Sequence, residues 1–171
     1  MGARPPAGAC QVSYCSRELS DQTVGTMDTS PRRLVERFYH EVWNQRDETV
    51  AREILHPHFR FRGSLGPVLT GPDGFIAYLF RVHAALAGYT CEIEDLIESG
   101  PRVAARMRFG GVHRGTFFGV PATGKRVSWA GAAFFTTERD STERGQITEL
   151  WVLGDVDAIK QQLGLSCVTG L

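Results

Sequence analysis

Two side chains in the last third of the chain, His113 and Glu149, are of types that transfer protons near neutral pH. His113 ends an apolar stretch, and a turn rich in glycine and proline follows it. Glu149 lies two residues before Trp151, within a short segment that has the pattern of a β-strand. Imidazole and carboxylate groups are common general acids and bases. The region therefore indicates a small-molecule site with acid/base chemistry.

His113 belongs to a predicted strand over residues 102–113, in which alternate side chains face opposite sides. One face of this strand comprises Val103, Ala105, Met107, Phe109 and His113. Arginines dominate the other face, which we expect to meet solvent or another subunit. A neutral imidazole on the apolar face could accept a proton or donate a hydrogen bond to an enolate. The alternative is a structural histidine that fixes the loop leading to Pro121.

The elements around these residues follow from apolar periodicity and from turn residues. Ser30 and Pro31 suit the start of a helix, because serine caps helices and proline fits their first position. Gly110 and Gly111 could place a bulge that curls the sheet. The expected helices span residues 31–44, 48–55, a segment after 71, and 157–163. The expected strands span residues 59–63, 89–97, 102–113, 125–137 and 146–153.

Helices that precede a long antiparallel meander predict an α+β fold. Three N-terminal helices would pack on one face of a strongly curved, mainly antiparallel sheet, and such a cone encloses an apolar cavity. We expect the domain to span residues 30–166. Residues 1–29 lack periodicity and are expected to be a disordered extension, and residues 167–171 form a tail.

Charge and cysteine content narrow the class of protein. The chain has 19 basic and 19 acidic residues, which gives no electrostatic footprint for nucleic acid or an anionic membrane. No apolar run reaches the roughly 18–20 residues of a membrane span. The spacing of the four cysteines fits no zinc or redox motif, and His56 and His58 lack further metal ligands. Reduced thiols and a cytoplasmic location are expected.

Several short motifs occur in one order along residues 32–164. They are HPHF at 56–59, Gly71 before the third helix, EIEDLI at 92–97, RVAAR at 102–106, HRG at 113–115, GVPATGKR at 119–126, ITELW at 147–151 and QLG at 162–164. In this order and spacing the chain resembles the SnoaL-like polyketide cyclases, or ester cyclases, of the NTF2-like superfamily.

The resemblance implies a cone-shaped NTF2-like, cystatin-like fold that is often dimeric. It also implies a pocket for a hydrophobic small-molecule ligand and no metal or organic cofactor. In the best-known members a base removes a proton alpha to a carbonyl, and the enolate closes a ring by aldol addition. Because relatives in the superfamily run other reactions or only bind ligands, the fold does not fix the reaction.

One position departs from this family. An aspartate or histidine usually lies immediately before the tryptophan of the ITELW motif, and here that residue is Leu150. Glu149 is one residue away and would face the other side unless the strand is bulged. Otherwise it is a surface carboxylate paired with Arg106 or Arg108. His113 matches the family's histidine and is the principal catalytic candidate, with Glu149 as its possible partner.

The residues expected to line a substrate pocket are mostly aromatic. Planar aromatic walls suit a planar, polycyclic ligand, although ordinary core packing is the alternative. Tyr89 stands in a segment where many relatives carry Pro-Asp, and its hydroxyl could contribute a polar contact. The candidate pocket residues are Met107, Phe109, Trp129, Phe135, Trp151, Tyr89 and Leu150.

Three functions fit these observations. The first is a cofactor-independent cyclase or isomerase acting on a polyketide-like carbonyl compound. The second is a non-catalytic module for ligand binding or dimerisation, which Leu150 favours. The third is an accessory hydroxylation component of an aromatic polyketide pathway. If Glu149 faces solvent and no ionisable group other than His113 meets the cavity, the structure would argue against aldol chemistry.

Overall fold

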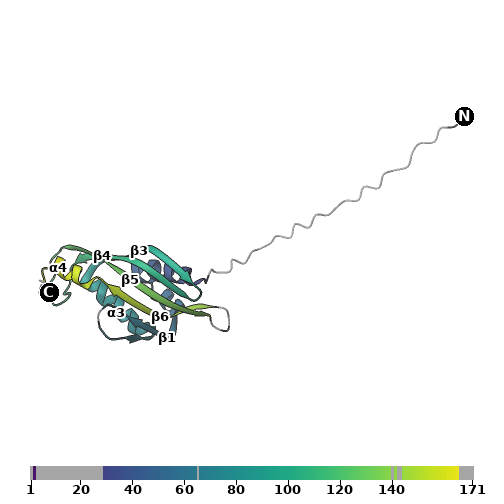
Figure 1. The fold of residues 1–171 in the computed structure, drawn as a ribbon, viewed down its shortest axis with the longest axis horizontal. Helices are drawn as coiled ribbons and strands as arrows, with labels where there is room; N and C mark the ends of the chain where they lie inside the picture. Colours follow the sequence, from purple (N-terminus) through teal and green to yellow (C-terminus); the bar gives the residue numbers. More distant parts are fainter. Residues whose placement is uncertain (1, 3–28, 65, 140, 142–143, 166–171) are drawn as a thin grey trace.

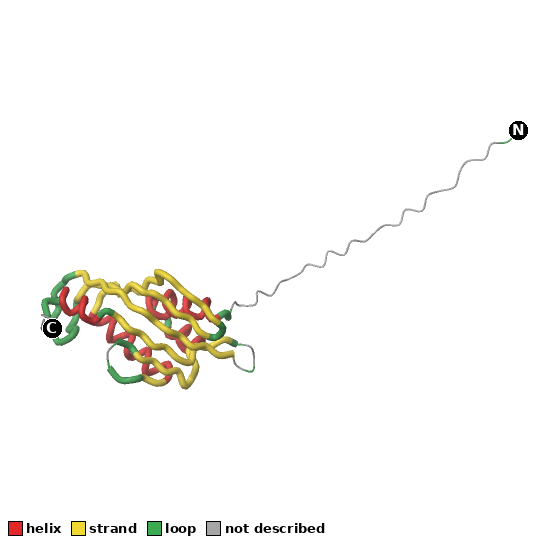
Figure 2. Tube along the Cα trace, viewed as in Figure 1, coloured by secondary structure: helices red, strands yellow, loops and turns green. Residues whose placement is uncertain are grey.

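The computed structural model of the chain describes residues 2, 29–64, 66–139, 141 and 144–165. Predictions for residues 1–28 and 166–171, including Cys10, Cys15 and Cys167, lie outside these residues, except at residue 2. Within them, helices cover one face of a six-stranded sheet whose order is β2-β1-β6-β5-β4-β3 (Figure 1, Figure 2). The predicted α+β fold is confirmed, with four helical segments in the first half of the chain, the first two of which form one continuous helix.

The first helix forms where its capping residues predict it. In α1 (Pro31–Arg37), the Ser30 side chain accepts a hydrogen bond from the backbone N–H of Arg33. The helix continues as a π-helical segment, η1 (Phe38–Trp43), in which the N–H of Asn44 reaches the carbonyl of Tyr39. The other helices are α2 (Glu48–Ile54), α3 (Gly71–Ala85) and α4 (Val156–Gln162).

Five strands match predicted segments, and β2 was not predicted. The strands are β1 (Leu55–Arg62), β2 (Leu69–Thr70), β3 (Leu86–Ser99), β4 (Arg102–His113), β5 (Arg126–Arg139) and β6 (Gly145–Gly154). β3 through β6 form an antiparallel meander, and β6 then pairs in parallel with β1. This parallel pair brings the residues after the first helices beside the last strand of the chain.

The bulge predicted at Gly110 and Gly111 lies on the neighbouring strand instead. The register between β3 and β4 shifts between Ala87 and Thr90, around Gly88, which has a positive φ of 59°. Gly111 faces this bulge, and a Cβ there would lie 3.1 Å from the Cβ of Leu86. The prediction is therefore corrected: the glycine in β4 permits the close approach, and β3 carries the extra residue.

A cluster of aromatic rings joins the helices to the inner face of the sheet. The rings of Phe38 and Phe135 meet edge to face with centroids 5.5 Å apart, and Phe38 also contacts Phe75 of α3 at 5.2 Å. Asn44 ties the end of η1 to β3, because its amide donates to the carbonyl of Cys91 and accepts from the N–H of Cys91. These contacts fix η1 against the sheet.

Candidate ligand-binding site

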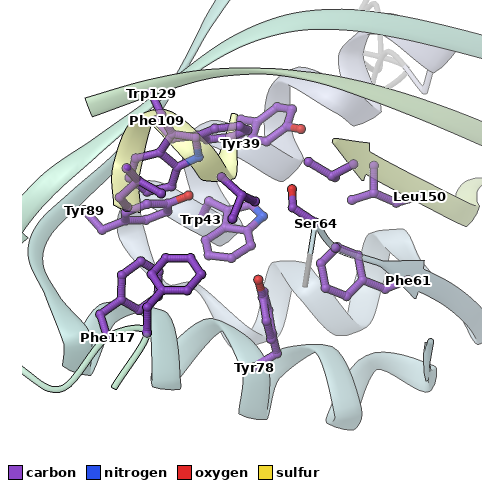
Figure 3. A pocket seen from close by; sticks show the side chains of 15 residues that line it. Tyr39, Trp43, Phe61, Ser64, Tyr78, Tyr89, Phe109, Phe117, Trp129 and Leu150 are labelled. Carbon is purple, nitrogen blue, oxygen red and sulfur yellow. The ribbon is translucent and has the colours of Figure 1, made fainter. Parts of the chain in front are cut away.

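A cavity with mostly aromatic walls lies between the inner face of the sheet and the helices (Figure 3). Water-sized molecules have about 70 Å³ of room in it, within about 600 Å³ of space free of protein atoms that extends into open solvent. Its walls come from almost every element of the fold. The lining residues are Tyr39, Trp43, Phe61, Gly63, Ser64, Tyr78, Tyr89, Phe109, Phe117, Phe118, Trp129, Leu150, Val152, Val156 and Ile159.

Local features of the sequence position the side chains that form these walls. Tyr39 and Trp43 are four residues apart in η1, so they project from the same face of the helix. The ring of His83 stacks near Trp43, and its Nε2 lies 2.9 Å from the Trp43 carbonyl oxygen. Gly131 leaves room for Phe109, since a Cβ at Gly131 would lie 2.6 Å from the Phe109 ring.

The polar groups of the cavity are hydroxyls and indole N–H groups. The Ser64 hydroxyl oxygen accepts a hydrogen bond from the N–H of Gly154 at 2.5 Å. In Figure 3 the hydroxyls of Ser64 and Tyr78 point toward the interior of the cavity. The described lining residues include no aspartate, glutamate, histidine, lysine or arginine. They therefore offer hydrogen-bond donors and no group that is charged near neutral pH.

Burial keeps the cavity phenols neutral. Desolvation raises the pKa of Tyr39 and of Tyr89 well above the ordinary tyrosine value. The pKa of Tyr78 is also raised by burial, although the charge of Arg81 opposes the shift. A neutral phenol donates a hydrogen bond to a carbonyl or enolate oxygen, and it is a poor base.

His113 is fully buried at the end of β4, but its side chain is not part of the cavity lining. Its Nδ1 lies 3.0 Å from the hydroxyl oxygen of Thr123 and accepts from the N–H of Thr123 at 3.3 Å. The backbone of His113 also bonds to Gly124 and Lys125. These contacts tie His113 to the loop over residues 114–124, while its Nε2 is buried without a hydrogen-bond partner among the described residues.

Glu149 faces away from the cavity although β6 is bulged, because it alternates with the inward-facing Leu150. The register between β5 and β6 shifts after Thr136↔Glu149, so that Thr137 pairs with Ile147 and Thr148 is the extra residue. The bulge places Ile147 on the same inward side as Leu150, and it does not bring Glu149 into the cavity. Glu149 pairs with Arg60 at 3.9 Å, and not with Arg106 or Arg108, which contact Glu94. Its predicted contact with the pocket is corrected.

The other predicted pocket residues divide into three groups. Tyr89, Phe109, Trp129 and Leu150 line the cavity. Met107 and Phe135 face the same side of the sheet but are buried in the core and are not part of the lining. Trp151 lies on the outer face, 36% exposed, with the Arg62 guanidinium 5.3 Å from its ring centroid. Its prediction as a pocket residue is corrected, because it alternates with Leu150 along β6.

Several lining residues were not predicted as site residues. Tyr39 has a detectable signal, because it precedes the predicted core residue Trp43 by one helical turn. Phe61 likewise follows Phe59 at strand spacing. Ser64 lies in a loop without periodicity, so only the folded structure brings it beside Gly154.

The sequence also led to expectations about metal binding, cysteine thiols and membrane spans, and these can be compared with the described residues. They contain no cluster of three or more histidine, cysteine, aspartate or glutamate residues that could hold a metal ion. The Nδ1 of His56 accepts a hydrogen bond from the backbone N–H of His58. Cys91 is a free thiol whose pKa is raised by burial. None of the described helices has the length and apolarity needed to cross a membrane.

The fold is that of the SnoaL-like polyketide cyclases. The sequence profile of the family described as SnoaL-like polyketide cyclase matches residues 33–163, so the chain belongs to this family. A SnoaL-like protein of known crystal structure from Jannaschia sp. CCS1 superposes with a TM-score of 0.70, covering 80% of this chain and 93% of its own. At 24% identity, this likeness supports the fold alone.

Two curated relatives carry a named activity. The chain is 35% identical over 105 residues to the aklanonic acid methyl ester cyclase DauD of Streptomyces sp. strain C5, which spans 57% of this chain and 59% of the relative. It is 34% identical over 96 residues to the aklanonic acid methyl ester cyclase DnrD of Streptomyces peucetius, which spans 52% of this chain and 63% of the relative. The match thus covers about six-tenths of each relative's length.

Proposed function

We propose that the cavity binds a planar, hydrophobic carbonyl compound of the polyketide type and promotes ring closure or isomerisation by stabilising its enolate. The observation that carries the proposal is a cavity with aromatic walls whose polar groups are neutral donors. Flat apolar walls favour a flat ligand, and donors favour a ligand with exposed carbonyl oxygens. The names of the two Streptomyces relatives support the same class of substrate.

The chemistry follows from what the lining lacks. An aldol ring closure breaks a C–H bond alpha to one carbonyl and forms a C–C bond to a second carbonyl carbon. Glu149 faces outward and no described lining residue is a base at neutral pH, which argues against aldol chemistry driven by a protein base. In a closure that the cavity promotes, the proton therefore passes to water, and the resulting alkoxide regains a proton. The hydroxyls stabilise the negative oxygen of the enolate as an oxyanion hole does. Binding without turnover is the second candidate, favoured by Leu150.

Tryptophan fluorescence provides the first test. Trp43 and Trp129 line the cavity and Trp151 lies outside it, so a Trp151→Phe variant reports on the cavity alone. With aklanonic acid methyl ester as the probe, we expect saturable quenching with a Kd between about 1 μM and 1 mM, the usual range of KM. Chromatography of the same mixtures would detect the ring-closed product.

The two readouts separate the candidate functions. Quenching together with ring closure faster than in buffer supports the enzyme. Quenching without product supports the binding module. A probe that produces no saturable quenching up to 1 mM would contradict both.

We also propose that the outer face of the sheet pairs with a second copy of the chain. Phe134, Trp151 and Leu153 are exposed there on neighbouring strands, beside Ile97 of β3. Ile97, Phe134 and Trp151 line a hollow on this face, and Arg102 and Glu149 border it. Exposed apolar patches of this kind mark interfaces, and opposite charges on one face allow a self-complementary contact about a twofold axis.

A charge placed on this face should prevent dimer formation. We expect sedimentation equilibrium to give the native chain twice its mass of 18.9 kDa, and to give Trp151→Glu the monomer mass, because association would bury the new carboxylate. Phe80→Glu is the matched control, since Phe80 is an exposed apolar residue of α3. A native chain that stays monomeric at high concentration, or equal effects of the two variants, would contradict the proposal.

A further inference from the structure

The Tyr39 hydroxyl is a buried polar group without a hydrogen-bond partner in the part of the chain that the structure describes. The residue is 2% exposed, and it lines the cavity. A buried hydroxyl left unpaired costs about 1–3 kcal/mol. Such a group needs an explanation, and a ligand in the cavity would supply the missing partner.

The surroundings of Tyr39 hold its ring in one place. Its ring packs edge to face against Phe38 at 5.2 Å and against Phe135 at 5.7 Å. Its carbonyl accepts the π-helical bond from Asn44, whose side chain is bonded to the backbone of Cys91. Single π-helical turns are frequent at functional sites. The hydroxyl is therefore positioned in advance, and binding would not have to order it.

The remaining hydroxyls of the cavity differ from that of Tyr39. The Ser64 oxygen already accepts from Gly154, and the Tyr89 hydroxyl interacts with the thiol of Cys91. The Tyr78 hydroxyl also points into the cavity, but it is not among the fully buried side-chain atoms that lack a hydrogen-bond partner. Tyr39 also lines the cavity together with Leu150. No charged side chain among the described lining residues competes with Tyr39 for a ligand oxygen.

On the basis of the ligand-binding function proposed above, we propose that Tyr39 is the hydrogen-bond donor that determines the ligand specificity of the cavity. Its hydroxyl donates a hydrogen bond to a carbonyl oxygen of a flat, neutral ring system and selects such ligands over the corresponding hydrocarbons. Discrimination of this kind is strong because an analogue that lacks the oxygen leaves the buried hydroxyl unpaired.

A pair of probes that differ by one oxygen isolates this bond. We expect the full chain to bind 9-fluorenone more tightly than fluorene, measured by quenching in the Trp151→Phe background. Tyr39→Phe keeps the ring and removes the hydroxyl, and it should weaken fluorenone binding about tenfold, equivalent to 1.4 kcal/mol. Fluorene binding should change by less than about twofold, because the hydrocarbon has no acceptor for the hydroxyl. Thr148→Val is the control, because it removes a hydroxyl that donates to the Thr136 carbonyl outside the cavity lining, and it should change neither affinity by more than about twofold.

The outcomes distinguish this inference from the proposed function. If the chain binds both probes and Tyr39→Phe leaves fluorenone affinity unchanged, the role of Tyr39 is wrong while the cavity remains a binding site. Equal losses for both probes would point to altered packing and would also overturn it. A melting temperature lowered by Tyr39→Phe would show that the hydroxyl is bonded within the protein. If neither probe binds the parent chain, the proposed function fails as well.

Discussion

A Leu150→Asp variant should close the ring of aklanonic acid methyl ester about 10² to 10⁴-fold faster than the native chain, the range that a positioned general base contributes. Leu150 is 1% exposed and lines the cavity. In the sheet it pairs with Phe135 of β5 on one side and with Phe61 of β1 on the other. A carboxylate there would enter the same space as the neutral hydroxyls. The cavity would then hold a base for the alpha proton and donors for the enolate oxygen.

The same substitution should lower stability, and this cost is part of the test. A carboxyl group at a buried position loses hydration, which raises its pKa and favours the neutral acid. The rate should therefore rise with pH until the carboxyl is ionised and then reach a plateau. Thermal unfolding, followed by circular dichroism, should show a lower melting temperature for the variant in the absence of the probe.

Leu150→Asn is the control for this prediction, since asparagine matches aspartate in shape but has no ionisable group. The asparagine variant should share the loss of stability and gain no activity. Equal rates for the native chain, Leu150→Asp and Leu150→Asn would show that the probe does not reach this wall of the cavity, provided that the aspartate variant is folded. An equal gain in both variants would point to polarity rather than proton transfer.

The fold was largely predictable because the apolar residues of its main strands and helices recur at regular spacing. Residues 102–113 alternate without interruption, and β4 has the predicted bounds. Ser30 and Pro31 mark the start of α1 by their own chemistry. The parallel pairing of β1 with β6 was not predicted, because no local pattern of residues 55–62 specifies a partner almost ninety positions away. That pairing depends on tertiary packing.

The candidate site was less predictable, for a physical reason that Thr148 illustrates. One extra residue in β6 changes which side chains face inward after it, and the composition of the strand does not reveal the insertion. Leu150 was predicted to face the pocket and does line the cavity, whereas Trp151 lies outside. Ser64 and Tyr39 became candidates only when the cavity placed a loop beside a helix.

The largest loss of stability is expected from Phe135→Ala. Phe135 is 2% exposed, and its ring lies against Phe38 and Tyr39 at 5.5 and 5.7 Å. Truncation of a buried phenylalanine costs about 3–5 kcal/mol, because apolar contacts are lost and a cavity remains. The neighbouring Phe134 points to the opposite face of β5 and is 53% exposed, so Phe134→Ala should cost less than about 1 kcal/mol.

Urea denaturation at a concentration where the chain is monomeric gives the free energies of unfolding without a contribution from association. The two substitutions remove the same atoms from adjacent residues, so their difference reports which face of β5 is buried. It also reports on the cavity, because loss of the Phe135 ring frees Tyr39 to move. Phe135→Ala should therefore bind 9-fluorenone more weakly, whereas Phe134→Ala should bind it like the native chain. Similar free energies for the two variants would contradict the facing of β5 and, with it, the position assigned to Tyr39.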